Sequence, residues 1–365
     1  MRLRDLVGHL ESIAPTRHAE SWDNAGLLVG DPEQVVTKAM LTIDYTPSVA
    51  AEAREQGCDL VIAYHPPIFQ AVKRITAEGP TKLIYDAIRH GVAVYSPHTA
   101  LDVADGGTND LLADLLGLTD RHPLRTIETK SRSHKLTTFV PRDAVDKVAD
   151  ALFEAGAGRI GDYIRCSFRA DGTGTFMGGA DTSPTVGQAG VFERAPETKL
   201  ETICPIAKLP QIIAALRQSH PYEEPAFDLV QLAAPPETIG QGRIGDMPPT
   251  DLSILLVRIK ADLGLPSLLI AGPTNRTVTR AAVLAGAGRE HLKDAIAQGA
   301  QLYLTGEIPH HDALAAAAAG VTVVATLHSN SERASLKRLS DRLAAVAPAV
   351  PFILSQSDRD PFQIL

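Results

Sequence analysis

The chain contains an internal duplication of alternating strand and helix patterns, and this feature constrains its fold more than any other. Residues 36–39 resemble residues 278–281, and the same offset carries Leu60 onto Leu302 and His65 onto Glu307. Each copy predicts strand, helix, strand, helix, strand, at 36–44, 50–56, 59–66, 82–90 and 91–98, and again at 280–288, 290–299, 301–307, 310–320 and 321–328. Such alternation indicates βαβ units and largely parallel sheets with helix-covered faces. The sequence therefore predicts an α/β fold whose core consists of two duplicated βαβ half-domains.

The stretch between the two copies, about residues 133–232, has a different pattern. It predicts a strand at 134–141, a helix at 144–156, a hairpin at 161–177, a strand at 199–206, a helix at 209–221 and a strand at 226–233. This β-α-β-β-α-β order is the ferredoxin-like plan. We therefore expect the first half of the core at 1–128, an inserted α+β ferredoxin-like domain at 129–235 and the second half at 236–365, because surface loops tolerate insertions.

Two features of the inserted stretch invite a ligand-binding interpretation, which the sequence does not favour. The glycines at 172 and 174 are not followed by the helix and lysine of a phosphate-binding loop, so we assign them to a hairpin turn. The polar segment 220–225, His-Pro-Tyr-Glu-Glu-Pro, is assigned to the loop before the last strand and to an oligomer contact in preference to a ligand contact.

Composition narrows the classes of partner. The formal net charge is −8 and no dense run of lysine and arginine is present, which disfavours nucleic acid as a primary partner. The three cysteines, Cys58, Cys166 and Cys204, are odd in number and widely spaced, which argues against a disulfide framework and for a reducing compartment. No apolar run approaches the length of a membrane span. We therefore expect a cytoplasmic protein without a membrane partner, acting on a small-molecule substrate or ligand.

Histidines and carboxylates stand at the ends of several predicted strands. His98 and Asp102 share a spacing with His328 and Glu332, a histidine followed by a carboxylate four residues later, and His65 and Glu307 also end predicted strands. Ligands bind at the carboxyl ends of strands in open α/β sheets, so these side chains should share one edge. Imidazole and carboxylate ligands without thiolates suit zinc, iron, manganese, nickel or cobalt and do not distinguish among them. The sequence thus predicts a divalent-metal site shared between the two half-domains.

Several longer motifs carry a family resemblance. They are SWDNAGLLVGD at 21–31, His-Pro at 65–66, SPHTALDVADGGTNDLLADLLGL at 96–118, TGE at 305–307, HHDAL at 310–314 and LHSNSE at 327–332, with YIRCSFRADGTGTFM and HPYEEPAFD in the insertion. The chain resembles the long form of the Nif-three-like family, described as dinuclear metal centre hexameric proteins and often labelled GTP cyclohydrolase type 2 homologues. The resemblance implies a di-metal site between two half-domains and a ring-shaped homohexamer.

The resemblance also assigns ligands. His65 matches the second histidine of the family's His-His-Pro motif, and Asp102, His328 and Glu332 match its remaining ligands, the two carboxylates as bridges. Tyr64 stands where the family has its first histidine, and a neutral phenol is a poor ligand unless a metal lowers its pKa. We therefore expect one or two divalent ions per chain, with one position lost, weakened or held through a tyrosinate at Tyr64.

Two functions follow from this site. The first is a metal-dependent hydrolase acting on a nucleotide-like small molecule, GTP cyclohydrolase chemistry being one version, with Glu307 or His98 moving protons. The alternative is a non-catalytic metal- or ligand-binding protein with a regulatory or scaffold role. An open coordination position would distinguish the two, because a catalytic site needs one. Asp44, His310 and His311 are further candidates for supporting positions around the metal.

Overall fold

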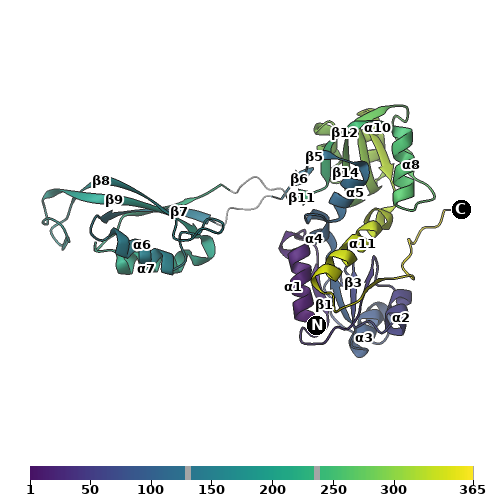
Figure 1. Ribbon diagram of the computed structural model, residues 1–365, viewed down its shortest axis with the longest axis horizontal. Coiled ribbons are helices and arrows are strands. Elements are labelled where there is room, and N and C mark those ends of the chain that lie inside the picture. Colours follow the sequence, from purple (N-terminus) through teal and green to yellow (C-terminus); the bar gives the residue numbers. More distant parts are fainter. Residues whose placement is uncertain (128–132, 234–238, 365) are drawn as a thin grey trace. The chain divides into compact units, whose positions relative to one another are not determined.

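The structure is a computed structural model that describes residues 1–127, 133–233 and 239–364 of the 365-residue chain. The chain divides into two compact units. The core unit comprises Met1–Ile127 and Thr238–Leu365, and the inserted unit comprises Glu128–Glu237. The core unit holds two large sheets and one two-stranded sheet, and the inserted unit holds one sheet (Figure 1).

The first sheet of the core unit is built from the three strands of the first sequence copy and two flanking strands, at residues 26–29 and 352–354. Its strand order is β1-β4-β3-β2-β17, in which β2, β3, β4 and β17 run parallel and β1 pairs antiparallel with β4. Helices α2 and α3 pack on one face, whereas α1 buries Leu3, Leu6 and Leu10 on the other. The elements are α1 (Leu3–Ile13), β1 (Gly26–Val29), β2 (Ala39–Thr42), α2 (Pro47–Glu55), β3 (Leu60–Ala63), α3 (Lys82–Arg89), β4 (Ala93–Ser96) and β17 (Phe352–Leu354), with short 3-10 turns η1 (Thr16–His18) and η2 (Gly79–Thr81).

The second sheet of the core unit repeats this plan. Strands β14, β15 and β16 run parallel, and β13 pairs antiparallel with β16 as β1 does with β4. The full order is β13-β16-β15-β14-β12-β5, so antiparallel strands extend the sheet beyond the predicted parallel set. The elements are β5 (Thr119–His122), β12 (Arg243–Asp251), α8 (Leu252–Asp262), β13 (Leu269–Ala271), β14 (Thr277–Ala287), α9 (Leu292–Ala297), β15 (Leu302–Glu307), α10 (His310–Ala318) and β16 (Thr322–Ala325), beside the small pair β6 (Arg125–Thr126) and β11 (Gly240–Gln241). The predicted duplication of α/β half-domains is confirmed.

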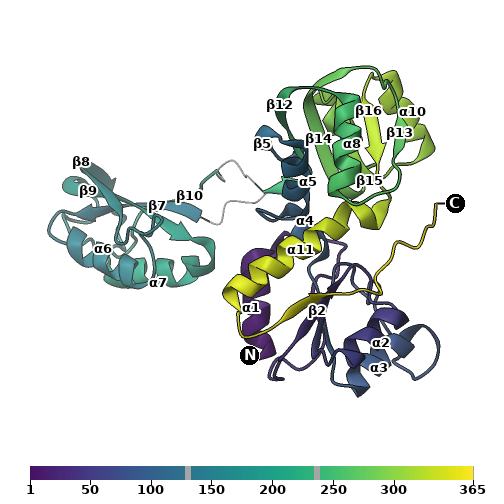
Figure 2. The ribbon, with the colours of Figure 1, turned by 45° about the vertical axis from the view of Figure 1, so that its right-hand side comes forward.

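Helix α11 (His328–Val346) joins the two sheets. It contacts β14 and β15 of the second sheet and β2 and β17 of the first, and Figures 1 and 2 both show it lying along the two. Two shorter helices, α4 (His98–Val103) and α5 (Thr108–Leu116), follow β4 and lead into the second half. Buried Arg243 of β12 donates from Nε to Asp110 of α5 at 2.6 Å, an ion pair that ties these elements together.

The inserted unit is an antiparallel sheet with two helices on one face. Its order is β10-β7-β9-β8, and α6 and α7 pack on it through a core that includes Leu136, Leu152, Leu200 and Leu216. The elements are β7 (Ser133–Pro141), α6 (Val145–Glu154), β8 (Ser167–Met177), β9 (Phe192–Pro205), η3 (Ile206–Lys208), α7 (Leu209–Ser219) and β10 (Phe227–Gln231). This is the β-α-β-β-α-β order that the sequence predicted.

The predicted turn at residues 172–174 is wrong. These residues lie inside β8, where Gly172 pairs with Glu197 and Gly174 with Ala195 in an unbroken register with β9. A Cβ added to Gly174 would lie 2.0 Å from Glu197 Oε2, so glycine is present because a neighbouring side chain crosses the strand here. Glycine in a strand interior often marks such a close approach rather than a turn.

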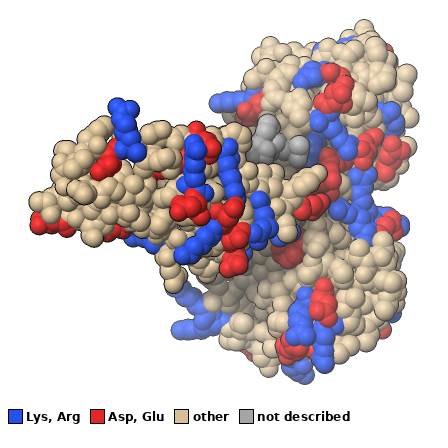
Figure 3. Space-filling model, turned by 60° about the vertical axis from the view of Figure 1, so that its left-hand side comes forward, with Lys and Arg blue, Asp and Glu red and all other residues tan. Residues whose placement is uncertain are grey.

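The molecular surface mixes both signs of charge. On the face in Figure 3, lysine and arginine side chains are interspersed with aspartate and glutamate. Within the three described segments, no helix has the length and apolar character needed to cross a membrane.

Candidate metal centre

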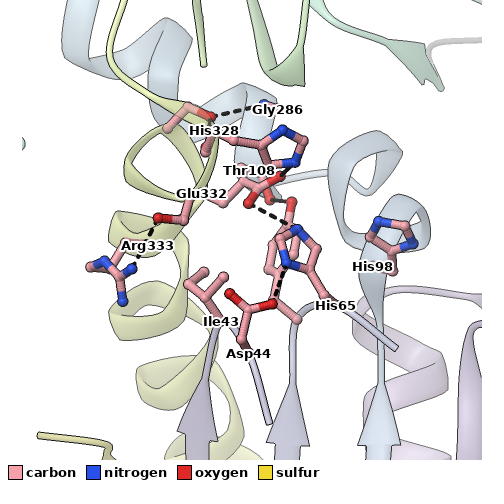
Figure 4. Close-up of polar contacts among 12 residues, drawn as sticks. Ile43, Asp44, His65, His98, Thr108, Gly286, His328, Glu332 and Arg333 are labelled. Atoms are coloured by element: carbon pink, nitrogen blue, oxygen red, sulfur yellow. Dashed lines mark hydrogen bonds and ion pairs between the residues drawn. The ribbon is translucent and has the colours of Figure 1, made fainter. Parts of the chain in front are cut away.

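Two histidines from opposite halves of the core converge on one buried carboxylate. His65 follows β3 and His328 follows β16, and their Nε2 atoms lie 3.2 Å and 3.3 Å from the two oxygens of Glu332 (Figure 4). One ligand atom from each of the three residues lies within 4.8 Å of the others. His328 and Glu332 occupy the first turn of α11, where a spacing of four residues places both side chains on one face. Strand ends from the two halves therefore bring together three side chains of the types that bind metal ions.

The other nitrogen of each histidine also faces a carboxylate. His65 Nδ1 lies 2.9 Å from Asp44 Oδ1, and His328 Nδ1 lies 3.0 Å from Glu307 Oε1. Metal-bound histidines in proteins usually have such a partner, which fixes the tautomer and the orientation of the ring. Asp44 and Glu307 therefore each lie on the Nδ1 side of one ring, while Nε2 of each ring faces Glu332.

The polar atoms at the centre are incompletely satisfied. Glu332 is only 3% exposed, and among the described residues its Oε2 and His65 Nε2 are buried without a hydrogen bond of normal geometry, although they lie 3.2 Å apart. Buried polar atoms of this kind are costly unless something satisfies them. The backbone of Gly286 lies against the same group, since a Cβ at this position would lie 2.9 Å from Glu332 Oε1 and 3.3 Å from His328 Nε2. The donor set and the space around it fit a divalent cation.

Electrostatics favour positive charge at this point. Although burial lowers the pKa of His65, the hydrogen bond with Asp44 and the close approach of the Glu332 carboxylate outweigh burial and raise the pKa to about 10. The Glu332 carboxylate, 3.3 Å from His328 Nε2, also raises the pKa of His328, to about 9. Burial would raise the pKa of Glu332, but the two histidines lower it overall. Without a metal, protons on the imidazoles balance the carboxylates, so metal binding has to displace them.

The Tyr64 hydroxyl already has hydrogen-bond partners outside this three-residue group. The Tyr64 side chain is fully buried, and its hydroxyl donates to Asp102 Oδ1 and lies 2.9 Å from Thr108 Oγ1. Burial, followed by the charges of Asp102 and Glu332, raises the pKa of Tyr64 well above its ordinary value, so the phenol is a neutral donor. Burial and Glu332 raise the pKa of Asp102 to about 7. Asp102 is close to the centre but lies outside the three-residue group.

His98 has a carboxylate partner of its own. Its Nδ1 lies 2.6 Å from Asp23 Oδ1, and the other oxygen of Asp23 accepts from the backbone and side chain of Thr99. Burial alone would raise the pKa of Asp23, but the hydrogen bonds with His98 and Thr99 outweigh it and lower the pKa. The His98 ring lies 5.5 Å from the His65 ring, so His98 borders the centre. Asp23 was missed in the sequence, although it lies in the SWDNAGLLVGD motif.

A pair of exposed aromatic rings, Trp22 beside His98 and Phe69 beside Trp22, was also missed. Trp22 is 53% exposed and Phe69 is 52% exposed, and their ring centroids lie 5.9 Å apart. Trp22 also lies 5.9 Å from the His98 ring. By contrast, His310 and His311 contact each other at the exposed start of α10 and are not members of the ligand group found in the described segments.

The fold and this group define a duplicated α/β protein with a candidate metal centre where the strand ends of its two halves meet. The chain belongs to the family described as Duf34/NIF3 (NGG1p interacting factor 3), which it matches over residues 1–361. The resemblance drawn from the sequence motifs is thereby confirmed.

Known relatives and solved structures match this chain over nearly its whole length. It is 35% identical to the GTP cyclohydrolase 1 type 2 homolog of Halalkalibacterium halodurans, over 99% of this chain and 98% of the relative. It is 34% identical to the protein of the same name from Bacillus subtilis, with the same coverage. The Staphylococcus aureus protein SA1388 superimposes with a TM-score of 0.85 at 30% identity, covering 100% of this chain and 99% of that one. A Bacillus cereus protein related to NIF3 has a TM-score of 0.77 at 32% identity, with the same coverage.

Proposed function

We propose that this chain is a divalent-metal-dependent hydrolase whose centre, formed by His65, His328 and Glu332, holds one metal ion per chain. The observation that carries the proposal is the pair of buried, unsatisfied atoms at this point, His65 Nε2 and Glu332 Oε2. Nδ1 of each histidine contacts a carboxylate, an interaction that in proteins orients metal-binding imidazoles and fixes their tautomer. Two histidines and one carboxylate also form the ligand set of many hydrolytic zinc sites, which leaves a coordination position open.

The chemistry divides between the ion and the side chains. A bound divalent ion would supply Lewis acidity, which activates water and polarises the bond to be broken. Asp44 and Glu307 hold the two imidazoles in orientation. Asp23 fixes Nδ1 of His98, which leaves Nε2 of that ring available to accept or deliver a proton beside the centre. His98 is therefore the proposed general base or acid, and Glu307 acts through His328.

The substrate class is proposed from the aromatic rings next to His98. Trp22 exposes a large apolar surface beside His98, Phe69 lies next to Trp22, and exposed rings of this kind stack well on planar heterocycles. The relatives carry the name GTP cyclohydrolase 1 type 2 homolog, which points to the same class of molecule. We therefore propose a nucleotide-like small molecule as the substrate and opening of its ring by water as one version of the reaction.

One observation favours the alternative, a non-catalytic metal- or ligand-binding protein with a regulatory or scaffold role. The Tyr64 hydroxyl occupies an oxygen of Asp102, the residue that the family resemblance assigns as a bridge between two metals. A protonated phenol cannot serve as the ligand that a histidine would provide at this position. A chain that does not catalyse hydrolysis would tolerate such a change.

Metal analysis followed by an activity screen tests the proposal. The purified protein, stripped with a chelator and reloaded in turn with zinc, manganese, iron, nickel and cobalt, is expected to hold one ion per chain. Glu332→Ala should lose this ion and Tyr64→Phe should keep it, whereas Tyr64→His should gain a second one. Hydrolysis of GTP or a related nucleotide should require the reloaded metal.

The possible results separate the two functions. A loaded protein that is inert on a nucleotide panel supports the non-catalytic alternative. Two ions in the unaltered protein, both retained in Tyr64→Phe, contradict the single-metal assignment. No uptake of any of the five metals contradicts the centre itself.

A further inference from the structure

The inserted unit contains a cavity to which the proposed function assigns no role. The cavity has a volume of about 710 Å³ and is lined by residues of β7, β8 and β9, of the loop that follows β8 and of the loop before β10. Side chains alternate along a strand, so Glu197 and Lys199 of β9 project on the opposite face from Leu200, which packs against the helices. The cavity therefore lies over the sheet face that α6 and α7 leave uncovered. Its size is within the range of small-molecule sites.

A buried carboxylate without a cation faces this cavity. Glu197 is 7% exposed, lines the cavity and forms no ion pair within residues 133–233 or elsewhere in the described parts of the chain. Burying a carboxylate is unfavourable unless a positive group or several donors satisfy it. The strand beneath is shaped to accept this side chain, because any Cβ at position 174 would collide with the Glu197 carboxylate. Glycine at that position thus places the charge at the cavity wall.

A second polar atom in the wall is also unsatisfied. Tyr222 Oη is buried and, among the described residues, forms no hydrogen bond of normal geometry. Burial, followed by the Glu197 carboxylate, raises the pKa of Tyr222 above its ordinary value, so the phenol remains neutral. The cavity therefore offers one charged acceptor and one hydroxyl next to each other.

The rest of the lining combines aromatic and apolar residues, threonines and charged side chains. Phe139, Phe176 and Tyr222 supply rings, and the last two have centroids 6.3 Å apart. The charged lining residues are four acids and one lysine: Asp171, Glu197, Glu223, Glu224 and Lys199. Lys199 is already paired with Glu201, at 2.6 Å. This balance opposes a phosphate or carboxylate ligand, whereas ring faces and an unpaired carboxylate both attract cations.

We propose that this cavity is a binding site for a small organic cation, an amine, amidine or guanidinium carried on an apolar or aromatic body, with Glu197 as its counter-ion. The cationic head would take the Glu197 carboxylate, and the body would pack against Phe139 and Phe176. The Tyr222 hydroxyl would hydrogen-bond to the ligand or to Glu197 once the head is in place. The site lies wholly within the inserted unit and uses none of the residues of the metal centre. It gives the segment 220–225 a role in ligand contact, which the sequence did not favour.

Benzamidine is a suitable probe, because it joins a planar cation to an aromatic ring and has a neutral isostere in benzamide. Calorimetric titration of the full-length protein is expected to show saturable binding of benzamidine and binding at least tenfold weaker for benzamide, since only the cation pairs with Glu197. Glu197→Gln should weaken benzamidine binding at least tenfold. Glu154→Gln is the control, because Glu154 is an exposed carboxylate at the end of α6 and is not among the residues that line the cavity. It should bind as the unaltered protein does.

Gly174→Ala provides a second variant, since its methyl group would displace the Glu197 carboxylate and should also weaken binding. Circular dichroism establishes that each variant is folded. If both cavity variants fail to fold, the comparison of benzamidine with benzamide on the unaltered protein decides. Equal binding of the two probes, no saturable binding, or unchanged affinity in folded Glu197→Gln would overturn the proposal.

Discussion

Replacing Tyr64 with phenylalanine should destabilise the core unit by an amount that depends on pH. The hydroxyl that is removed donates to Asp102, whose pKa is raised to about 7 by burial and by Glu332. Above pH 7 the hydroxyl therefore donates to a carboxylate, and below it to a neutral acid. Losing a hydrogen bond to a charged group costs about 2 kcal/mol, and losing a neutral one costs about 1 kcal/mol. We expect a loss of about 2 kcal/mol at pH 8.5 and about 1 kcal/mol at pH 5.5.

The sign follows from linkage. The pKa of Asp102 is about 7 in the folded chain and about 4 in the unfolded chain. Ionisation of Asp102 therefore makes folding less favourable as the pH rises from about 4 to about 7. The hydrogen bond from Tyr64 lowers the pKa of Asp102 and limits this loss. Without the hydroxyl the loss is larger, and the difference between the two proteins therefore grows with pH.

Urea unfolding in the presence of a chelator measures the effect. Trp22 is the one tryptophan of the sequence and belongs to the core unit, so its fluorescence reports on that unit. Tyr303→Phe is the matched control: Tyr303 is also fully buried, but its hydroxyl donates to the neutral carbonyl of Gly288 at 2.8 Å. This control should lose about 1 kcal/mol at both pH values. If Tyr64→Phe and Tyr303→Phe lose equal free energy at both pH values, Tyr64 does not donate to an ionised Asp102.

Three further predictions test other parts of the structure. Asp44→Asn and Glu307→Gln should each weaken metal binding about 10- to 100-fold, because each removes the carboxylate that orients a metal-binding imidazole; calorimetry at fixed pH checks this, and unchanged affinity would contradict the supporting role. Gly286→Ala should abolish metal uptake in elemental analysis while the chain stays folded, because the new Cβ would lie 2.9 Å from Glu332 Oε1 and the backbone there has a φ of +66°. Burial lowers the pKa of His220, whose ring donates to one backbone carbonyl and accepts from one backbone amide. The folded state therefore binds fewer protons than the unfolded state, so the inserted unit should lose stability as the pH falls through about 6.5, and urea unfolding followed by circular dichroism should show His220→Gln lacking this part of the pH dependence.

Patterns along the chain were enough to specify the architecture of the core and to indicate which strand ends could supply the candidate metal centre. Strand and helix periodicities recur at a fixed offset, which specifies two βαβ halves, and polar residues at strand ends must gather at one edge of each sheet. These patterns predict that a wider set of strand-end residues shares one edge, and the structure brings three of them, His65, His328 and Glu332, into one group. Local patterns of the same kind also specify the order of elements in the inserted unit.

What each polar group does depends on contacts that form only in the folded chain. His65 and Glu307 occupy equivalent positions in the two copies, yet His65 faces Glu332 directly, whereas Glu307 stands behind His328. Equivalent positions differ because partners come from elements remote in the chain, and a hydrogen bond depends on separations of a few ångströms that periodicity does not encode. For the same reason, the Tyr64 hydroxyl pairs with Asp102, and Gly174 lies within a strand to make room for Glu197. Local sequence specifies backbone patterns, whereas pairing and burial across the fold specify chemistry.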